Sequence, residues 1–374
     1  MASNLARRVL TGEGGIDFVG RRRTWYSITA AILVACILGI ALKGFSLGID
    51  FEGGTKMNMP AGNLEPAQVS QVFEQATGVE PSLTQVVGSG DSRLMEINSQ
   101  RLDQDQIDKA REALFEKFQP EGSNGKPTPD SIGDSTVSES WGSTITNRML
   151  MSLGIFLVLI FGYITLRFER DMAIAAIAGL AVDGIVVAGI YAFIGFEVTP
   201  ATVIGLLTVL AFSLYDTVVV FDKVKENTAG WEFTNRTYAE QANLAVNQTV
   251  MRSIATTVIS ALPIASLMVV AVWLMGVGTL KDLALVQMIG VIEGTFSSVF
   301  LATPILVSLK NRSKKVREHT EKVMREREGA AEEAVAESDA AVAVDSQAGP
   351  ARRTVHVDQP QSAHTTGTTW RPGQ

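Results

Sequence analysis

The chain has 374 residues, of which 46% are hydrophobic and 19% are charged, and its formal net charge is −7. Soluble domains carry roughly 25% charged residues, so the deficit indicates a membrane protein. The negative charge argues against nucleic-acid binding, which depends on positive charge. The single cysteine, Cys36, excludes an intrachain disulfide, and the lack of a cysteine–histidine pattern predicts that the chain binds no metal or other cofactor.

Six apolar segments are long enough to cross a bilayer as helices, which takes about 20 mostly apolar residues. They are Trp25–Leu42, Ile145–Leu166, Met172–Ile194, Val198–Phe221, Ile254–Met275 and Leu283–Leu309. Lysines and arginines gather before the first segment, in the loops after the second and fourth, and after the sixth. The positive-inside rule therefore predicts an α-helical polytopic protein of the plasma membrane with both termini in the cytoplasm.

The segment between the first two spans is predicted to form an extracytoplasmic domain. Its apolar residues alternate as in strands or recur at helical spacing. The predicted elements are strands at Thr55–Met59, Ser82–Val87, Leu94–Ile97 and Ile132–Val137, and helices at Glu65–Thr77 and Gln104–Phe118. In chain order these elements read β-α-β-β-α-β, which is the order of a small α+β ferredoxin-like domain.

The predicted domain organisation follows from these segments. Residues 1–24 form a cytoplasmic N-terminus, 25–42 the first span, 43–144 the extracytoplasmic domain, 145–309 the other five spans, and 310–374 a cytoplasmic tail. The tail is rich in Ala, Glu, Gly, Thr and Gln and holds few large apolar residues, so it is predicted to be disordered.

Charged side chains inside a span cost about 2.5–3.5 kcal/mol on insertion scales, and they therefore mark candidate functional sites. Asp216 lies near the cytoplasmic end of the fourth span, and Arg252 begins the fifth span from the same side. If the two helices pack together, the carboxyl group can load and release a proton as the arginine moves. A static buried ion pair that fixes the helix packing fits the same spacing.

Three further polar residues lie within the spans. Asp183 is near the middle of the third span, where Gly184 and Gly189 are predicted to permit close helix contact. Asp183 is either a second proton-relay group or a polar packing residue. Ser213, one turn before the aspartate of the fourth span, is predicted to hold water near that carboxylate. Glu293 in the sixth span either hydrogen-bonds another helix, faces a partner subunit or carries a proton.

Four motifs carry a family resemblance. They are Gly48-Ile-Asp-Phe-Glu-Gly-Gly54, Ser213-Leu-Tyr-Asp-Thr-Val-Val-Val-Phe-Asp-Lys-Val-Lys-Glu-Asn227, Asn247-Gln-Thr-Val-Met-Arg-Ser253, and a last span with Gly290, Gly294, Ser297, Ser298 and Pro304. Together they cover about Arg21 to Leu309 and resemble the SecF family of the resistance-nodulation-division superfamily. Each short motif is moderately specific, and the four in order make a strong resemblance.

The resemblance implies a non-enzymatic subunit of the Sec protein-export complex. Such a subunit couples proton flow to the late-stage translocation of preproteins. The implied partners are a SecD-like subunit, the SecYEG channel, the unfolded preprotein and the lipid bilayer, with no nucleic acid. Asp216 matches the proton-coupling aspartate of the family and Arg252 matches its arginine. Val182 stands where many relatives have a histidine, which leaves the relay role of Asp183 open.

The first motif has two interpretations. Gly48, Asp50, Gly53 and Gly54 are predicted to form a joint between the membrane spans and the outer domain, because glycines permit the necessary turn. The alternative is direct contact with the preprotein.

Two other functions fit part of the sequence pattern. A translocon scaffold that moves no protons fits the static ion-pair interpretation. Half of a small-molecule efflux pump fits the six spans, but the outer domain is small for such a pump and the motifs favour export.

Overall fold

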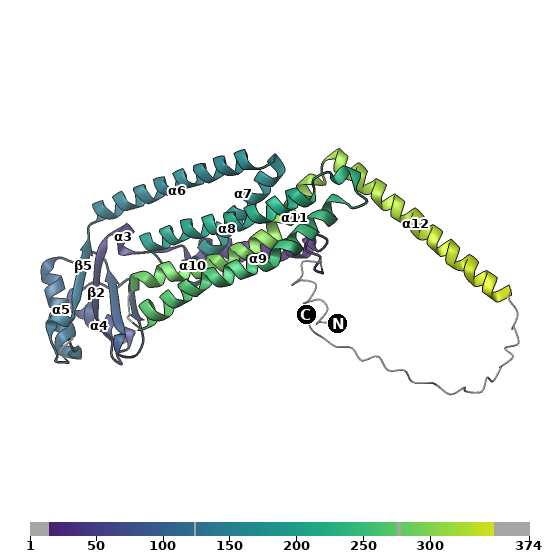
Figure 1. The fold of residues 1–374 in the computed structure, drawn as a ribbon. Coiled ribbons are helices and arrows are strands. Elements are labelled where there is room, and N and C mark those ends of the chain that lie inside the picture. The colour runs from purple at the N-terminus through teal and green to yellow at the C-terminus, as the bar shows by residue number, and fades with distance from the viewer. Residues whose placement is uncertain (1–14, 123–124, 275–277, 348–374) are drawn as a thin grey trace, which may run out of the picture. The chain divides into compact units, whose positions relative to one another are not determined.

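The structure is a computed structural model that describes residues 15–122, 125–274 and 278–347 (Figure 1). Within these residues, six helical segments are long and apolar enough to cross a membrane, so the protein is a multi-pass membrane protein. The segments are α2 (Arg22–Lys43), α6 (Glu139–Arg167), α7 (Arg170–Ile194), α8 (Pro200–Asn227), α9 (Tyr238–Leu267) with its π-helical extension η4 (Met268–Leu274), and α10 (Gly278–Ser297), which continues through η5 (Ser298–Ala302) into α11 (Thr303–Lys310). Each of the six predicted spans coincides with one of these helical segments, although Met275 lies outside the described residues.

Glycines set the closest helix contacts in the membrane bundle. A Cβ atom at Gly294 of α10 would lie only 2.8 Å from the Cβ of Ser213 on α8, so only glycine permits this approach. Gly189 of α7 lies directly against Cys36 of α2, as predicted for a close contact. The same prediction for Gly184 is wrong, because an added Cβ there would meet no atom within 4 Å. Adjacent helical residues point about 100° apart, and here Asp183 rather than Gly184 faces the neighbouring helices.

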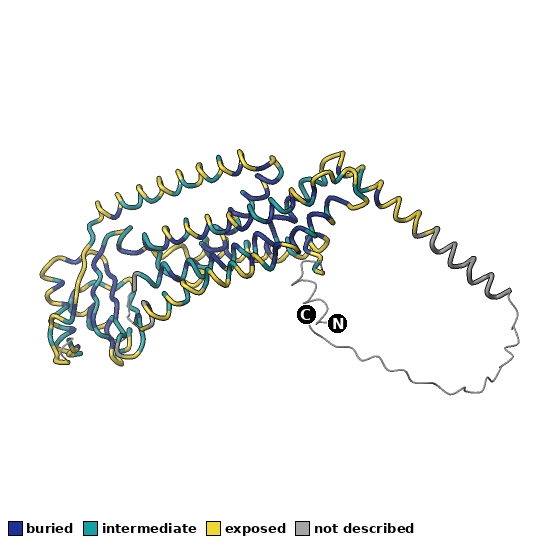
Figure 2. The backbone as a smooth tube through the Cα atoms, in the orientation of Figure 1, coloured by how far each residue is buried: buried dark blue, intermediate teal, exposed yellow. Residues whose placement is uncertain are grey.

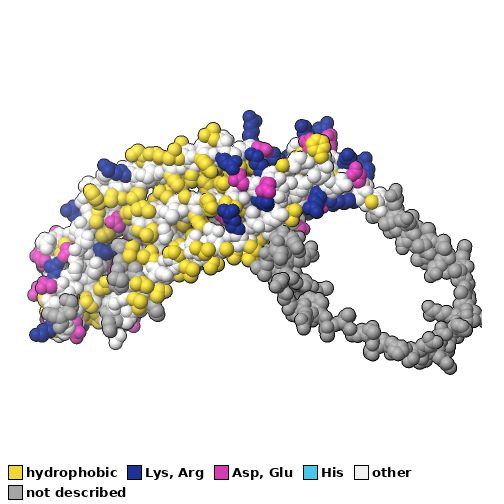
Figure 3. Space-filling model, viewed as in Figure 1, with side chains coloured by type: hydrophobic (Ala, Val, Ile, Leu, Met, Phe, Trp, Pro, Cys, Tyr) yellow, Lys and Arg dark blue, Asp and Glu magenta, His cyan; other side chains and the backbone are white. Residues whose placement is uncertain are grey.

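Helix α6 is buried at only two of its residues, Gly142 and Ile164. Figure 2 shows exposed positions along its length, and its main contact is with the short helix α3 (Ile49–Glu52) near its start. Large apolar side chains on it are exposed, among them Leu150, Val158 and Leu166. Figure 3 shows hydrophobic side chains over the bundle, with charged ones gathered on the outer domain and near the other end of the helices. This distribution suits a bundle whose sides face lipid or a partner.

The segment between α2 and α6, called the outer domain after its predicted location, contains a four-stranded sheet and two helices in the predicted chain order. The elements are β2 (Gly54–Pro60), α4 (Pro66–Thr77), β3 (Leu83–Val87), β4 (Leu94–Ser99), α5 (Gln104–Phe118) and β5 (Gly133–Val137). The strand order is β3-β4-β2-β5, and neighbouring strands run antiparallel. Each predicted element is therefore confirmed to within a few residues.

The two faces of this sheet differ in polarity. Met57 and Met95 are fully buried, together with Phe73 of α4 and Leu114 of α5, and form the core of the domain. Because side chains alternate along a strand, the opposite face carries polar residues, including Asn98. That face contacts the loops of the membrane bundle, as described below.

The segment after the last span differs from the prediction. The structure has a helix, α12 (Lys314–Gln347), where the sequence pattern predicted disorder. Ala, Glu, Lys and Arg are strong helix formers, and pairs such as Lys314–Glu318, with 3.6 Å between Nζ and Oε1, add support between successive turns. Residues 348–374, the remainder of the predicted disordered tail, lie outside the described residues.

Candidate functional site

Asp216 is buried at the junction of three helical segments. Its side chain, on α8, is 4% exposed. The Ser253 hydroxyl of α9 donates a hydrogen bond of 2.7 Å to Oδ1. The Ser298 hydroxyl of η5 donates to Oδ2. Both carboxyl oxygens are therefore bound by hydroxyl groups of other segments, and Asp216 ties α8 to α9 and to η5.

The Arg252 side chain lies away from Asp216. Helices α8 and α9 pack together, but the Arg252 side chain is exposed and its Nη2 donates to the Tyr215 hydroxyl at 3.3 Å. No salt bridge joins Arg252 to Asp216 in the described structure. Since successive residues of a helix point about 100° apart, Ser253 facing Asp216 turns Arg252 away. The predicted direct contact between the two charged groups is thus replaced by a serine contact.

Asp183 forms a second buried acidic group close to the first. It is fully buried on α7, and the Ser213 hydroxyl of α8 donates to its Oδ2. Ser297 and Glu293 of α10 lie within hydrogen-bonding reach of its side chain. The structure therefore brings Asp183, Ser213 and Glu293 together, three of the residues singled out from the sequence.

Serine pairs connect the two acidic groups. Ser297 lies within reach of Asp183, and the next residue, Ser298, bonds Asp216. Ser213, bound to Asp183, is one turn from Asp216 on the same helix. In the sequence, Ser253, Ser297 and Ser298 stand only within the family motifs, and no role was predicted for them. Hydroxyl residues spaced through apolar spans were the available signal.

Comparison with known proteins gives the family. The model of "Protein export membrane protein SecD/SecF, C-terminal" matches residues 119–312, and that of the "SecD/SecF GG Motif" matches residues 39–62. The chain belongs to the SecD/SecF family. It is 55% identical over 321 residues to the protein translocase subunit SecF of Mycobacterium tuberculosis strain H37Rv, covering 86% of this chain and 73% of that protein. It is 40% identical over 337 residues to the SecF of Streptomyces coelicolor, covering 89% and 87%.

Solved structures of SecDF show the same fold. The crystal structure of SecDF, a translocon-associated membrane protein from Thermus thermophilus, superposes with a TM-score of 0.67 at 26% identity, covering 79% of this chain and 39% of that one. The super-membrane-facing form of SecDF gives a TM-score of 0.55 at 27% identity, covering 82% and 40%. The chain thus corresponds to about two fifths of a SecDF chain.

The GG motif of the SecD/SecF family lies where the outer domain joins the membrane helices. The Gly48 amide donates to the Val198 carbonyl at 2.8 Å, beside a short parallel pairing of β1 (Ser46–Leu47) with β6 (Glu197–Val198). Asp50 lies in the following short helix, α3. Gly53 has a positive φ of 81°, and a Cβ there would lie 2.9 Å from the backbone nitrogen of Glu139 at the start of α6. The motif therefore occupies a tightly packed joint.

A polar contact that the sequence analysis missed holds the outer domain against the bundle. Asn98 Nδ2 on β4 donates to both carboxylate oxygens of Glu197, at 3.1 and 3.2 Å. Lys281, in the first turn of α10, donates to Gln85 Oε1 on β3 at 2.7 Å. Burial raises the pKa of the Glu197 carboxyl, while the nearby cations Lys56 and Lys281 oppose that shift. These residues are polar loop and strand residues whose pairing depends on tertiary structure.

Proposed function

We propose that this chain is a SecF-like subunit of the Sec protein-export complex, and that it couples proton flow to late-stage translocation of preproteins. Its relatives are protein translocase subunits, and the related SecDF is a translocon-associated membrane protein. Because SecDF contains the matching region within a longer chain, a SecD-like subunit is the natural partner. The SecYEG channel and an unfolded preprotein complete the proposed assembly, with the lipid bilayer around it.

The observation that carries this proposal is the pair of serine bonds to Asp216. An ionised carboxylate only accepts hydrogen bonds, whereas a protonated one must donate its own hydrogen. Uptake of a proton by Asp216 therefore changes the bond to Ser253 or the bond to Ser298. Because the two serines belong to α9 and η5, a change in protonation alters how these segments are tied to α8.

Arg252 is proposed to take part in the loading and release of the proton at Asp216. It is adjacent to Ser253, so a turn of α9 by about 100°, one residue of an α-helix, exchanges the serine for the guanidinium beside Asp216. An ionised Asp216 carboxylate then gains a cationic partner, whereas the protonated carboxyl group is neutral and is not stabilised by a nearby cation. Each proton that crosses the membrane supplies about 2.3 kcal/mol per 100 mV.

The remaining parts of the protein fit this role. The proposed orientation has both termini in the cytoplasm of the cell and the sheet domain on the outer side of the plasma membrane. The antiparallel strand order β3-β4-β2-β5 supports a ferredoxin-like assignment for that domain. The proposed movement passes from α8 to the outer domain through the loop that carries Glu197, which lies directly before α8 and bonds Asn98.

A translocon scaffold that moves no protons is the second candidate. The observation in its favour is that both oxygens of Asp216 already have hydroxyl partners. Such a carboxylate can serve as a static tie between helices.

An export assay with membrane vesicles that contain the full complex distinguishes the proton-coupled subunit from the scaffold. The variant is Asp216→Asn, and the matched control is Asp222→Asn, which alters an exposed α8 acid paired with Arg167 at 2.8 Å. With ATP supplied, imposing a membrane potential should increase completed translocation in the wild type and in the control but have no effect in Asp216→Asn. A normally assembled Asp216→Asn variant that keeps the full response to the potential would favour the scaffold.

A further inference from the structure

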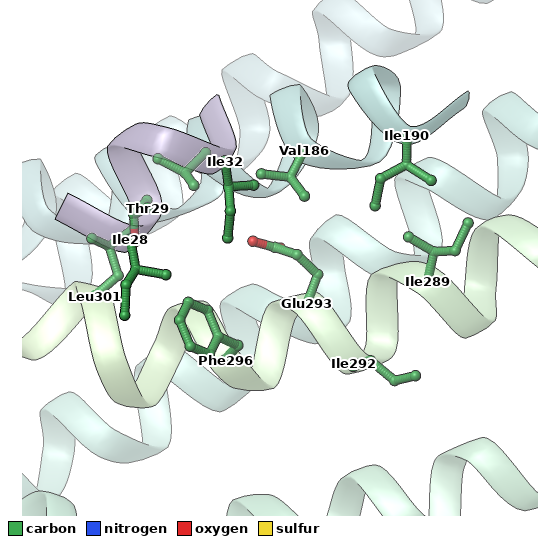
Figure 4. A pocket seen from close by; sticks show the side chains of 11 residues that line it. Ile28, Thr29, Ile32, Val186, Ile190, Ile289, Ile292, Glu293, Phe296 and Leu301 are labelled. Carbon is green, nitrogen blue, oxygen red and sulfur yellow. The ribbon is translucent and has the colours of Figure 1, made fainter. Parts of the chain in front are cut away.

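An apolar pocket reaches the buried acidic cluster from the side of the bundle. It has a volume of about 410 Å³ and lies between α2, α7 and α10 (Figure 4). Its walls are mostly branched aliphatic side chains, such as Ile32 and Val186, with Phe296 at one end. Glu293 is the one carboxylic acid among the described residues that line it, and Figure 4 shows its carboxyl group pointing into the pocket.

The carboxyl groups of Glu293 and Asp183 lie close together, with no described N–H or hydroxyl donor between them. Neither Asp183 Oδ1 nor Glu293 Oε2 accepts a hydrogen bond from an N–H or hydroxyl group, although both atoms are buried. The two side chains nevertheless lie within hydrogen-bonding reach of each other. Two carboxylates only accept, so the contact requires that one of them carry a hydrogen. Two ionised carboxylates within hydrogen-bonding reach in a nonpolar interior would otherwise repel each other strongly.

We propose that Asp183 and Glu293 share one proton and form a proton-holding site separate from Asp216, with the Glu293 carboxyl accessible from the apolar pocket. Asp183 is fully buried, and no described basic side chain contacts either acid, so a proton is the compensating positive charge within reach. This inference stands whether or not Asp216 carries protons during export.

The surroundings define what else can titrate there. Cys36 of α2 lies close enough for its thiol to interact electrostatically with Glu293. On α8, Ser213 donates to Asp183, and Asp216 lies one turn away, while α9 contributes the hydroxyl of Thr257, which bonds Thr295 of α10. The shared proton therefore lies beside the hydroxyl groups of Ser213 on α8 and Ser297 on α10.

An apolar carbodiimide tests the proposal, because it reacts with protonated carboxylic acids and partitions into lipid. The acid adds across a C=N bond: its proton goes to nitrogen, its oxygen bonds the central carbon, and the acyl group then migrates to nitrogen. Nothing leaves, so the whole reagent remains as added mass on the modified peptide. The reagent used is dicyclohexylcarbodiimide on the full chain in membrane vesicles at neutral pH. A charged, water-soluble carbodiimide serves as the comparison.

The expected result is an adduct on Glu293 with the apolar reagent and little with the charged one. When the pH is raised above neutral, Asp183→Asn should lose labelling of Glu293 at a lower pH than the wild type does, because it removes the like charge and supplies an amide donor to the glutamate. The matched control, Asp222→Asn, should label like the wild type. Protein that extracts in one monodisperse peak verifies folding of each variant. The proposal is overturned if Glu293 stays unlabelled at neutral pH, or if labelling in Asp183→Asn is lost at the same pH as in the wild type.

Discussion

Replacing Gly294 by alanine tests the close approach of α8 and α10. The added Cβ would lie 2.8 Å from Ser213 Cβ and 3.2 Å from its Cα. Nonbonded carbon atoms prefer separations of about 3.5–4.0 Å, so the helices must move apart by about 1 Å. Overpacking of this kind costs about 1–3 kcal/mol. The movement also pulls on Ser213, whose hydroxyl bonds Asp183.

Gly184→Ala is the matched control for this substitution. It gives the same gain in helix propensity, about 1 kcal/mol, but its Cβ meets no atom within 4 Å. We expect the free energy of unfolding of Gly294→Ala to be lower than that of the control by about 1–3 kcal/mol. The assay is equilibrium unfolding in mixed detergent micelles, followed by tryptophan fluorescence. Equal stability of the two variants would refute the reasoning, since it would mean that the helices are not in contact at Gly294.

Three further predictions test other contacts. Burial raises the pKa of Glu197, so near that pKa the folded protein binds more protons than the unfolded chain. Protonation of Glu197 therefore stabilises the folded protein at acidic pH, and this stabilisation is lost as the pH rises through the raised pKa. Thermal unfolding of Glu197→Gln should therefore depend less on pH over that range than unfolding of the wild type; an unchanged profile would contradict this. Asn98→Ala removes both bonds to Glu197, and we expect it to speed hydrogen exchange of β4 by about tenfold or more, since bonds to charged groups contribute about 1.5–3 kcal/mol. Asn247 exchanges hydrogen bonds with the Ile16 backbone at 3.2 and 2.9 Å, so Asn247→Ala should expose the segment around Ile16 to protease, whereas unchanged cleavage would show that the segment is held by other contacts.

The membrane spans and the outer domain could be predicted because their signals are local. Runs of apolar residues define the spans, and the alternation around Met57 or the helical spacing around Phe73 defines strands and helices. The helix α12 was missed because its composition, poor in large apolar residues, suits both a charged helix and a disordered tail. Charge pairs such as Lys314–Glu318 were the signal that favours the helix.

The candidate site was predictable in its acids but not in their partners. A charge in an apolar span is conspicuous in any sequence, so Asp216, Asp183 and Glu293 were identified. Which residue faces Asp216 depends on the rotation of α9 about its axis, and a difference of one residue exchanges Arg252 for Ser253. The close contact of Asp183 with Glu293 depends in the same way on the packing of α7 against α10.

The most direct test of the account is proton flux through the assembled complex. Vesicles that contain this chain with its SecD-like and channel partners would be loaded with a pH-sensitive dye and given a membrane potential during preprotein translocation. We predict potential-driven proton entry in the wild type and in Asp222→Asn, and its loss in Asp216→Asn. Equal flux in all three would contradict the claim that protons pass through Asp216.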